Sequence, residues 1–161
     1  VVVVNAGVAR MGLVDAVPVE DLDLQLDVNV RGVFLAIQAA LPHMKDGGRI
    51  VTIGSNIAQR SGFPGASVYQ TTKAAVAGMV KGLALDLAPR GITINNVQPG
   101  PTRTDMIGAL GNEGMDMVMG MVPLKRMAEP EEIAGLVSYI ARDEAGYVTG
   151  ASLTIDGGFA L

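Results

Sequence analysis

The chain has 161 residues, of which 49% are apolar and 17% are charged, and its formal net charge is −4. This length and composition suit one domain with a buried core, and an acidic balance argues against a nucleic-acid partner, whose binding surface is normally basic. No uninterrupted run of about 18 apolar residues and no leader-like segment is present, so we expect no membrane partner and a cytoplasmic location. Cysteine is lacking and the lone histidine, His43, has no clustered partners, so we expect no metal site.

Short runs of β-branched residues alternate with longer helical patterns along the chain. Strands are predicted at residues 1–4, 49–55, 92–97 and 152–155, and helices at residues 19–44, 67–87 and 130–142. This alternation is typical of βαβ units built around a parallel sheet. We therefore expect an α/β fold with three αβα layers, forming a single domain over residues 1–161 without repeats or linkers.

The segment 101–127 differs in character, because it is rich in glycine and methionine. Four of its methionines alternate along the chain, Met115, Met117, Met119 and Met121. Methionine fills irregular spaces in protein cores, and it also suits an adaptable apolar lid over a ligand. Both interpretations stay open at this point.

Tyr69 and Lys73 stand four residues apart in a predicted helix, which places them on the same helix face. A lysine ammonium beside the phenol favours the phenolate and lowers the tyrosine pKa from its usual value of about 10. A tyrosine tuned in this way can exchange a proton with an alcohol or carbonyl oxygen. The same spacing is common on ordinary surface helices, so the pair alone leaves that alternative open.

Three further positions accompany this pair. Ser55 follows a predicted strand, and the carboxyl ends of parallel strands face the crevice where ligands bind, although Ser55 could also simply end the strand. Asn29 lies inside a predicted helix, where asparagine is a mediocre helix former, so it has either a specific role or a position facing solvent. Asn5-Ala6-Gly7 follows the first strand and is either a plain turn or part of a binding site.

Together these motifs resemble the short-chain dehydrogenase/reductase family, specifically its 3-oxoacyl-[acyl-carrier-protein] reductase-like branch. The resemblance spans the whole chain and is carried by Asn5-Ala6-Gly7, Asn29, Ile53-Gly54-Ser55, Tyr69 with Lys73, the segment 90–95, Pro99-Gly100-Pro101-Thr102, Val148-Thr149-Gly150 and Asp156-Gly157-Gly158. It implies the C-terminal part of a doubly wound, Rossmann-like sheet, from the fourth strand onward. It also implies an NADP or NAD cofactor, a small carbonyl or alcohol substrate, and assembly into a homo-dimer or homo-tetramer.

The resemblance implies a catalytic role for four residues. Tyr69 would give a proton to the substrate oxygen or remove one, Ser55 would bind that oxygen, and Lys73 would lower the Tyr69 pKa and bind the nicotinamide ribose. Asn29 would anchor a relay water through its main chain. Cofactor contacts would come from Asn5, Ala6 and Gly7 near the adenosine, from Pro99 and Gly100 beside the nicotinamide, from the Thr102 hydroxyl, and from Tyr69 and Lys73 themselves.

The chain departs from the family pattern in one respect. The family's glycine-rich phosphate turn, Gly-x-x-x-Gly-x-Gly, does not occur in the sequence, and Gly47-Gly48 and Gly157-Gly158 have neither its place nor its spacing. We therefore expect the first βαβαβ portion of the fold to be absent. The chain is then either a fragment of a longer reductase or a natural short form, whose apolar edge at residues 1–4 would pair with another copy.

Two functions remain open. The first is an oxidoreductase that transfers hydride between NAD(P)(H) and a ketone or secondary alcohol, with a 3-oxoacyl-like substrate possible in principle. The alternative is a non-catalytic nucleotide-binding or regulatory protein, or an inactive truncated remnant of such an enzyme. Enoyl reduction is disfavoured, because enoyl reductases of this family space their tyrosine and lysine more widely than Tyr69 and Lys73.

Overall fold

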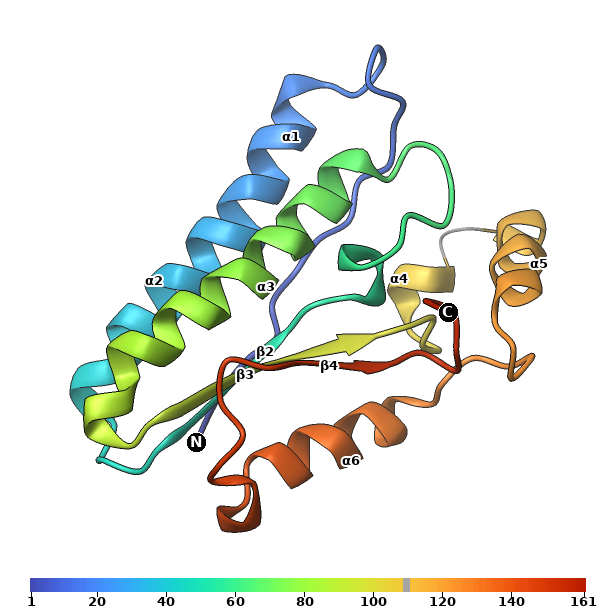
Figure 1. The fold of residues 1–161 in the computed structure, drawn as a ribbon. Coiled ribbons are helices and arrows are strands. Elements are labelled where there is room, and N and C mark those ends of the chain that lie inside the picture. The colour runs from blue at the N-terminus through green and yellow to red at the C-terminus, as the bar shows by residue number, and fades with distance from the viewer. Residues whose placement is uncertain (109–110) are drawn as a thin grey trace.

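The computed structural model describes residues 1–108 and 111–161 (Figure 1). Its strands are β1 (Val2–Val4), β2 (Arg49–Ile53), β3 (Thr93–Pro99) and β4 (Ser152–Ile155). Its α-helices are α1 (Val19–Leu26), α2 (Gly32–Ala40), α3 (Ser67–Leu87), α4 (Asp105–Gly108), α5 (Gly111–Met121) and α6 (Pro130–Ile140). Short helical turns are η1 (Asp27–Arg31), η2 (Leu41–His43), η3 (Asn56–Ala58), η4 (Ala88–Arg90) and η5 (Asp143–Ala145).

The four strands form one parallel sheet in the order β1-β2-β3-β4. The two central strands are buried along nearly their whole length, as expected when helices cover both faces of a parallel sheet. The predicted second strand ends earlier than expected, at Ile53, because Ser55 already begins the turn η3. The predicted α/β, Rossmann-like fold with three layers is confirmed.

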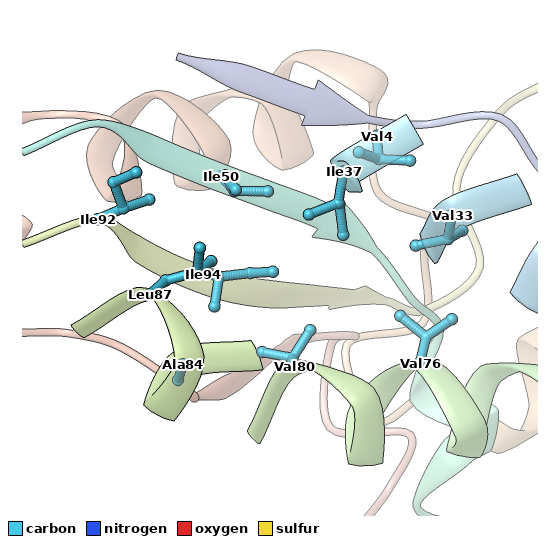
Figure 2. Close-up of a cluster of buried hydrophobic side chains, with 10 residues drawn as sticks. All are labelled: Val4, Val33, Ile37, Ile50, Val76, Val80, Ala84, Leu87, Ile92 and Ile94. Carbon is cyan, nitrogen blue, oxygen red and sulfur yellow. The ribbon is translucent and has the colours of Figure 1, made fainter. Parts of the chain in front are cut away.

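One face of the sheet is covered by α2 and α3, and α6 covers the other (Figure 1). Figure 2 shows the first interface, in which side chains of α3 point toward β2 and β3. Its buried members are Val4, Val33, Ile37, Ile50, Val76, Val80, Ala84, Leu87, Ile92 and Ile94. Burying one valine or leucine side chain contributes roughly 1.5–3 kcal/mol, so this cluster fixes α3 on the sheet.

The opposite face has a smaller buried cluster under α6, formed by Val51, Val97, Ile140 and Ala145. Successive residues of a strand point to opposite faces, which is why Ile50 belongs to the first cluster and Val51 to the second. The sheet is therefore anchored from both sides, and its carboxyl edge is left for the loops that follow β1, β2 and β3.

The predicted helix over residues 19–44 is a continuous helical path with an irregular middle. The π-helical turn η1 lies between α1 and α2, and η2 ends the path at His43. By length and composition alone, Val19–His43 is apolar enough to cross a membrane, which the sequence analysis did not expect. In the structure this path packs against α3 and β1, and 22% of its apolar window is buried. One such helix is weak evidence for a membrane span, because other kinds of helix meet the same criterion.

Two exposed apolar features bear on the predictions. In β1, Val3 is 46% exposed while Val4 is buried, and β1 pairs only with β2 among the described residues. Assembly with another copy across this edge stays a prediction.

In the segment 101–127, Val118 and Val122 are buried, whereas none of the four alternating methionines is fully buried. Met117 is exposed and the other three are half-buried, so core filling and a lid over a ligand both stay open for this segment.

Candidate active site

The end of β2 places Ser55 at the carboxyl edge of the sheet. A Cβ atom on Gly54 would lie 2.6 Å from Oδ1 of Asn96, so only glycine lets the chain leave the strand here. Ser55 follows, half-buried, and its Oγ caps η3 by accepting a hydrogen bond from the Ile57 N–H at 3.3 Å. The hydroxyl thus lies at the edge where ligands of such sheets bind, as predicted.

The first turns of α3 present Tyr69 and Lys73 to the same edge. The Lys73 side chain is buried, its residue being 5% exposed, which rules out a plain surface position. Its Nζ lies 5.6 Å from the centroid of the Tyr69 ring and donates a hydrogen bond to the Ile53 carbonyl at 3.0 Å. Because Ile53 stands two residues before Ser55, this bond ties the tyrosine helix to the strand end that carries the serine.

The expected electrostatic effect of Lys73 on Tyr69 needs correction. Burial raises the pKa of Tyr69 above its ordinary 10.0, and the hydrogen bond with the Ser55 side chain opposes this shift. Burial also lowers the pKa of Lys73 to about 8. Removal from water disfavours the charged form of both groups, and the Lys73 ammonium is directed at the Ile53 carbonyl. In this structure the phenol is therefore held in its protonated form.

Asn29 lies in the π-helical turn η1 and is only 1% exposed, so the solvent-facing alternative is wrong. Its Oδ1 accepts from the Val8 N–H at 2.9 Å, and its Nδ2 donates to the Val8 carbonyl at 2.8 Å. π-Helical turns inside α-helices are rare overall, and those that occur are frequently found at functional sites. The side chain is used to hold the segment after β1, which leaves the main chain of Asn29 for the predicted contact to water.

Thr72 is a site residue that the sequence analysis missed. It is fully buried, its Oγ1 donates to the Tyr69 carbonyl at 2.8 Å, and it accepts from Asn29 Nδ2 at 3.1 Å. The hydroxyl therefore connects Asn29 to the helical turn of Tyr69. A threonine inside a helix can bond back to a preceding carbonyl, and this was the only available signal in the sequence.

The predicted cofactor contacts after β1 lie beside the same group. Asn5 and Ala6 are exposed, and Gly7 is half-buried. A Cβ on Gly7 would lie 3.4 Å from both Asn29 Oδ1 and Lys73 Nζ. The backbone at Gly7 thus approaches two predicted catalytic side chains closely, which a plain solvent-exposed turn would not do.

The remaining predicted cofactor residues are the last residue of β3, Pro99, and residues of the loop that follows it at the same edge of the sheet. A Cβ on Gly100 would lie 2.6 Å from the backbone of Asp156, so only glycine fits here. The Gly100 N–H donates a hydrogen bond to the Ile155 carbonyl. The Thr102 Oγ1 donates to the Gly100 carbonyl at 2.9 Å. Its hydroxyl proton is therefore already used within the loop, and Thr102 would meet a ligand as an acceptor. Pro99, Gly100 and Thr102 have no hydrogen bond with Tyr69 or Lys73 among the described residues.

A second group that the sequence analysis missed lies next to Ser55. Asn56 is 6% exposed, and its Nδ2 donates to Asp156 Oδ2 at 3.4 Å. The Asp156 carboxylate also accepts from the N–H groups of Gly158 and Ala160, at 2.9 and 2.8 Å. This carboxylate joins the loop after β2 to the turn after β4.

Comparisons with known proteins identify relatives of this chain. Residues 1–160 match the model of a protein family described as enoyl-(acyl carrier protein) reductase. The chain is 43% identical over 159 residues to the cyclic-di-GMP-binding biofilm dispersal mediator protein of Escherichia coli, covering 99% of this chain and 67% of that protein. It is 39% identical over 163 residues to a 3-oxoacyl-[acyl-carrier-protein] reductase of Staphylococcus epidermidis, covering 100% of this chain and 66% of that enzyme.

A solved structure gives the same result. The crystal structure of a short-chain dehydrogenase from Burkholderia cenocepacia in complex with NADP superposes with a TM-score of 0.95 at 42% identity, covering 99% of this chain and 65% of that one. The chain thus spans about two thirds of the length of the relatives that it matches. The family match over nearly all residues shows that the chain belongs to the short-chain dehydrogenase/reductase family.

Proposed function

We propose that this chain carries the catalytic part of an oxidoreductase that transfers hydride between NADP(H) or NAD(H) and a ketone or secondary alcohol. One observation carries the proposal: the hydroxyl of Ser55, the phenol of Tyr69 and the ammonium of Lys73 gather at the carboxyl edge of the sheet. Such a group can bind and protonate a carbonyl oxygen. The 3-oxoacyl reductase relative makes a 3-oxoacyl thioester the first substrate to test.

In the proposed reduction, Tyr69 is the proton donor. The phenol carries its proton at neutral pH, and burial raises its pKa above the ordinary 10.0, so release of the proton to a developing alkoxide depends on a nearby positive charge. Ser55 hydrogen-bonds the same substrate oxygen and holds it beside the phenol. Lys73, with a pKa of about 8, carries its positive charge at pH 7 and stabilises the phenolate that the proton transfer leaves behind.

The residues of the site also fit a nicotinamide cofactor. When bound, the cofactor supplies or accepts the hydride. The Lys73 ammonium has three N–H donors, of which one is given to Ile53, so two can bind ribose hydroxyls. Asn5, Ala6 and the close-lying Gly7 backbone would border the adenosine side, and Pro99, Gly100 and Thr102 the nicotinamide. The complex of the Burkholderia relative with NADP supports this cofactor class.

The substitution Tyr69→Phe tests the proposal directly. We expect oxidation of reduced cofactor by a 3-oxoacyl thioester to fall about 10²- to 10⁴-fold, because a positioned general acid contributes that much. Cofactor binding, followed by nicotinamide fluorescence, should persist. The matched control is Tyr139→Phe, which alters a 47% exposed tyrosine on α6 and should leave the rate unchanged. An equal rate in the Tyr69→Phe protein would show that another group donates the proton.

Substrate choice is tested with a pair of thioesters. The family description names an enoyl reductase, which reduces a carbon–carbon double bond, whereas the proposal is carbonyl reduction. We expect turnover of the 3-oxoacyl thioester and none of the matching enoyl thioester, because Ser55 and Tyr69 together present two hydrogen-bonding groups to an oxygen. Preference for the enoyl thioester would contradict the proposed reaction.

A second candidate function is nucleotide-dependent regulation without turnover. It is favoured by the 43% identity with the cyclic-di-GMP-binding protein of Escherichia coli. Titration with cyclic di-GMP and with NADPH, each followed by calorimetry, separates the two functions. Binding of cyclic di-GMP without any thioester turnover would favour the regulatory function.

A further inference from the structure

Gln25 is a fully buried polar side chain, one helical turn before Asn29, that the proposed mechanism does not use. It lies in α1, has 0% exposure, and spends its whole carboxamide on main-chain groups. Its Oε1 accepts from the Arg10 N–H at 3.1 Å, and its Nε2 donates to the Arg10 carbonyl at 3.1 Å and to the Asp21 carbonyl at 3.3 Å. Burying a carboxamide costs free energy unless its polar atoms are hydrogen-bonded, and here all of these bonds go to the main chain.

One helical turn before Asn29, Gln25 makes the same pattern of contacts. Asn29 holds both the N–H and the carbonyl of Val8, just as Gln25 holds both groups of Arg10. Four residues of helix rise by about 6 Å. Two residues of extended chain advance by about 6.6 Å and direct their N–H and C=O groups to the same side. The spacing of two carboxamides that stand four residues apart in a helix therefore matches the spacing of every second residue in an extended chain.

The segment that they hold lies beyond the sheet. Strand β1 ends at Val4, and residues 5–13 belong to no helix or strand. Among the described residues, Val8 and Arg10 find these main-chain partners only in the two carboxamides. The side chains of Asn29 and Gln25 thus act as a substitute neighbouring strand and keep residues 8–10 extended.

We propose that Gln25 is a positioning residue, the second rung of a carboxamide ladder that extends β1 and sets the path of the chain past Gly7. This inference rests on the proposed function, because Gly7 belongs to the proposed cofactor contacts. The Gly7 backbone lies next to Asn29 and Lys73, since a Cβ placed on it would be in van der Waals contact with Asn29 Oδ1 and Lys73 Nζ, both at 3.4 Å. A loosened ladder would move that backbone and weaken cofactor binding, while Ser55 and Tyr69 would stay in place on β2 and α3.

The unchanged chain already provides one test, by amide hydrogen exchange measured with NMR. The Val8 and Arg10 N–H groups should exchange slowly, whereas the Ala9 N–H between them, which has no acceptor among the described residues, should exchange fast. This alternation in a segment without strand partners is the signature of the ladder. Equal and fast exchange at residues 8, 9 and 10 would overturn the proposal without any need for activity.

The substitution Gln25→Met keeps the side-chain length and removes the amide. We expect Arg10 exchange to accelerate about tenfold or more, because its main-chain groups lose their partners. The KM for the cofactor should rise several-fold while kcat stays within about twofold. The matched control is Gln38→Met, which changes an exposed glutamine of α2 and should alter neither quantity.

The outcomes of this pair of experiments are distinct. Unchanged exchange at Arg10 in the Gln25→Met protein, or acceleration spread equally over the amides of β2 and β3, would overturn the positioning role. A parallel loss of kcat with unchanged cofactor KM would overturn it as well. Lack of NADPH binding by the unchanged chain would instead contradict the proposed function, and the exchange pattern would still report on the ladder.

Discussion

The two ends of α3 carry out different tasks with one continuous helix face. At its C-terminal end the face is apolar and buries Val76, Val80, Ala84 and Leu87 against the sheet (Figure 2). At its N-terminal end the same stripe continues with Tyr69, Thr72 and Lys73, which are polar and extend to the carboxyl edge of the sheet. A helix whose apolar end is packed on the sheet can therefore hold the chemical groups at its other end in fixed positions.

The largest expected effect is a loss of stability when the apolar end of α3 is altered. We expect Leu87→Ala to lower the free energy of unfolding by about 2–5 kcal/mol, because it opens a cavity in the main core. Leu85→Ala is the matched control, since Leu85 lies two residues away and is 78% exposed, and it should change stability by less than about 0.5 kcal/mol. Urea unfolding measures both. Equal effects would show that α3 is not anchored as Figure 2 indicates.

At the polar end, the burial of Lys73 predicts a dependence of stability on pH. Its pKa falls from 10.5 in the unfolded chain to about 8 in the fold, so the unfolded chain binds more protons between these values. Stability should therefore rise as the pH increases from 8 toward 10, by about 3 kcal/mol at most, whereas below pH 8 the cost of burying the charge is constant.

The measurement is a series of urea unfolding curves between pH 7 and pH 10. Lys73→Met should remove the rise, because the variant has no ammonium to bury. Lys81→Met removes an exposed lysine from the same helix and should keep the slope of the parent chain. A slope that survives in Lys73→Met would assign the pH dependence to another group. In that case the polar end of α3 would not hold a destabilised charge.

The same contrast explains what could be predicted from the sequence. Helix α3 was predicted with its observed bounds, because its apolar period and the closing Pro89 are local signals. Ser55, Tyr69 and Lys73 were predicted as site residues from spacing and family resemblance, and their catalytic role stays a prediction. The direction of the Tyr69 pKa shift was wrong, because it depends on burial by residues distant in sequence. Thr72 and Gln25 were missed for the same reason, since their partners lie 43 and 15 residues away.

The smallest predicted effect concerns the link between the helix and the loop after β1. Thr72→Val keeps the shape of the side chain but removes the hydroxyl that joins Asn29 to the Tyr69 carbonyl. Loss of one buried hydrogen-bonding partner costs about 1–3 kcal/mol, and only part of this should reach catalysis. We expect kcat to fall up to about tenfold, far less than for Tyr69→Phe.

Thr72→Ser is the control for this link, because it keeps the hydroxyl and removes only a methyl group. It should retain most of the activity, while Thr72→Val should also free the one Nδ2 proton of Asn29 that Thr72 accepts, which NMR detects as faster exchange. If valine and serine at position 72 behave alike, the hydroxyl does not position Tyr69. The polar end of α3 would then be held by Lys73 and the Ile53 carbonyl alone, and the apolar end would account for the remaining order of the helix.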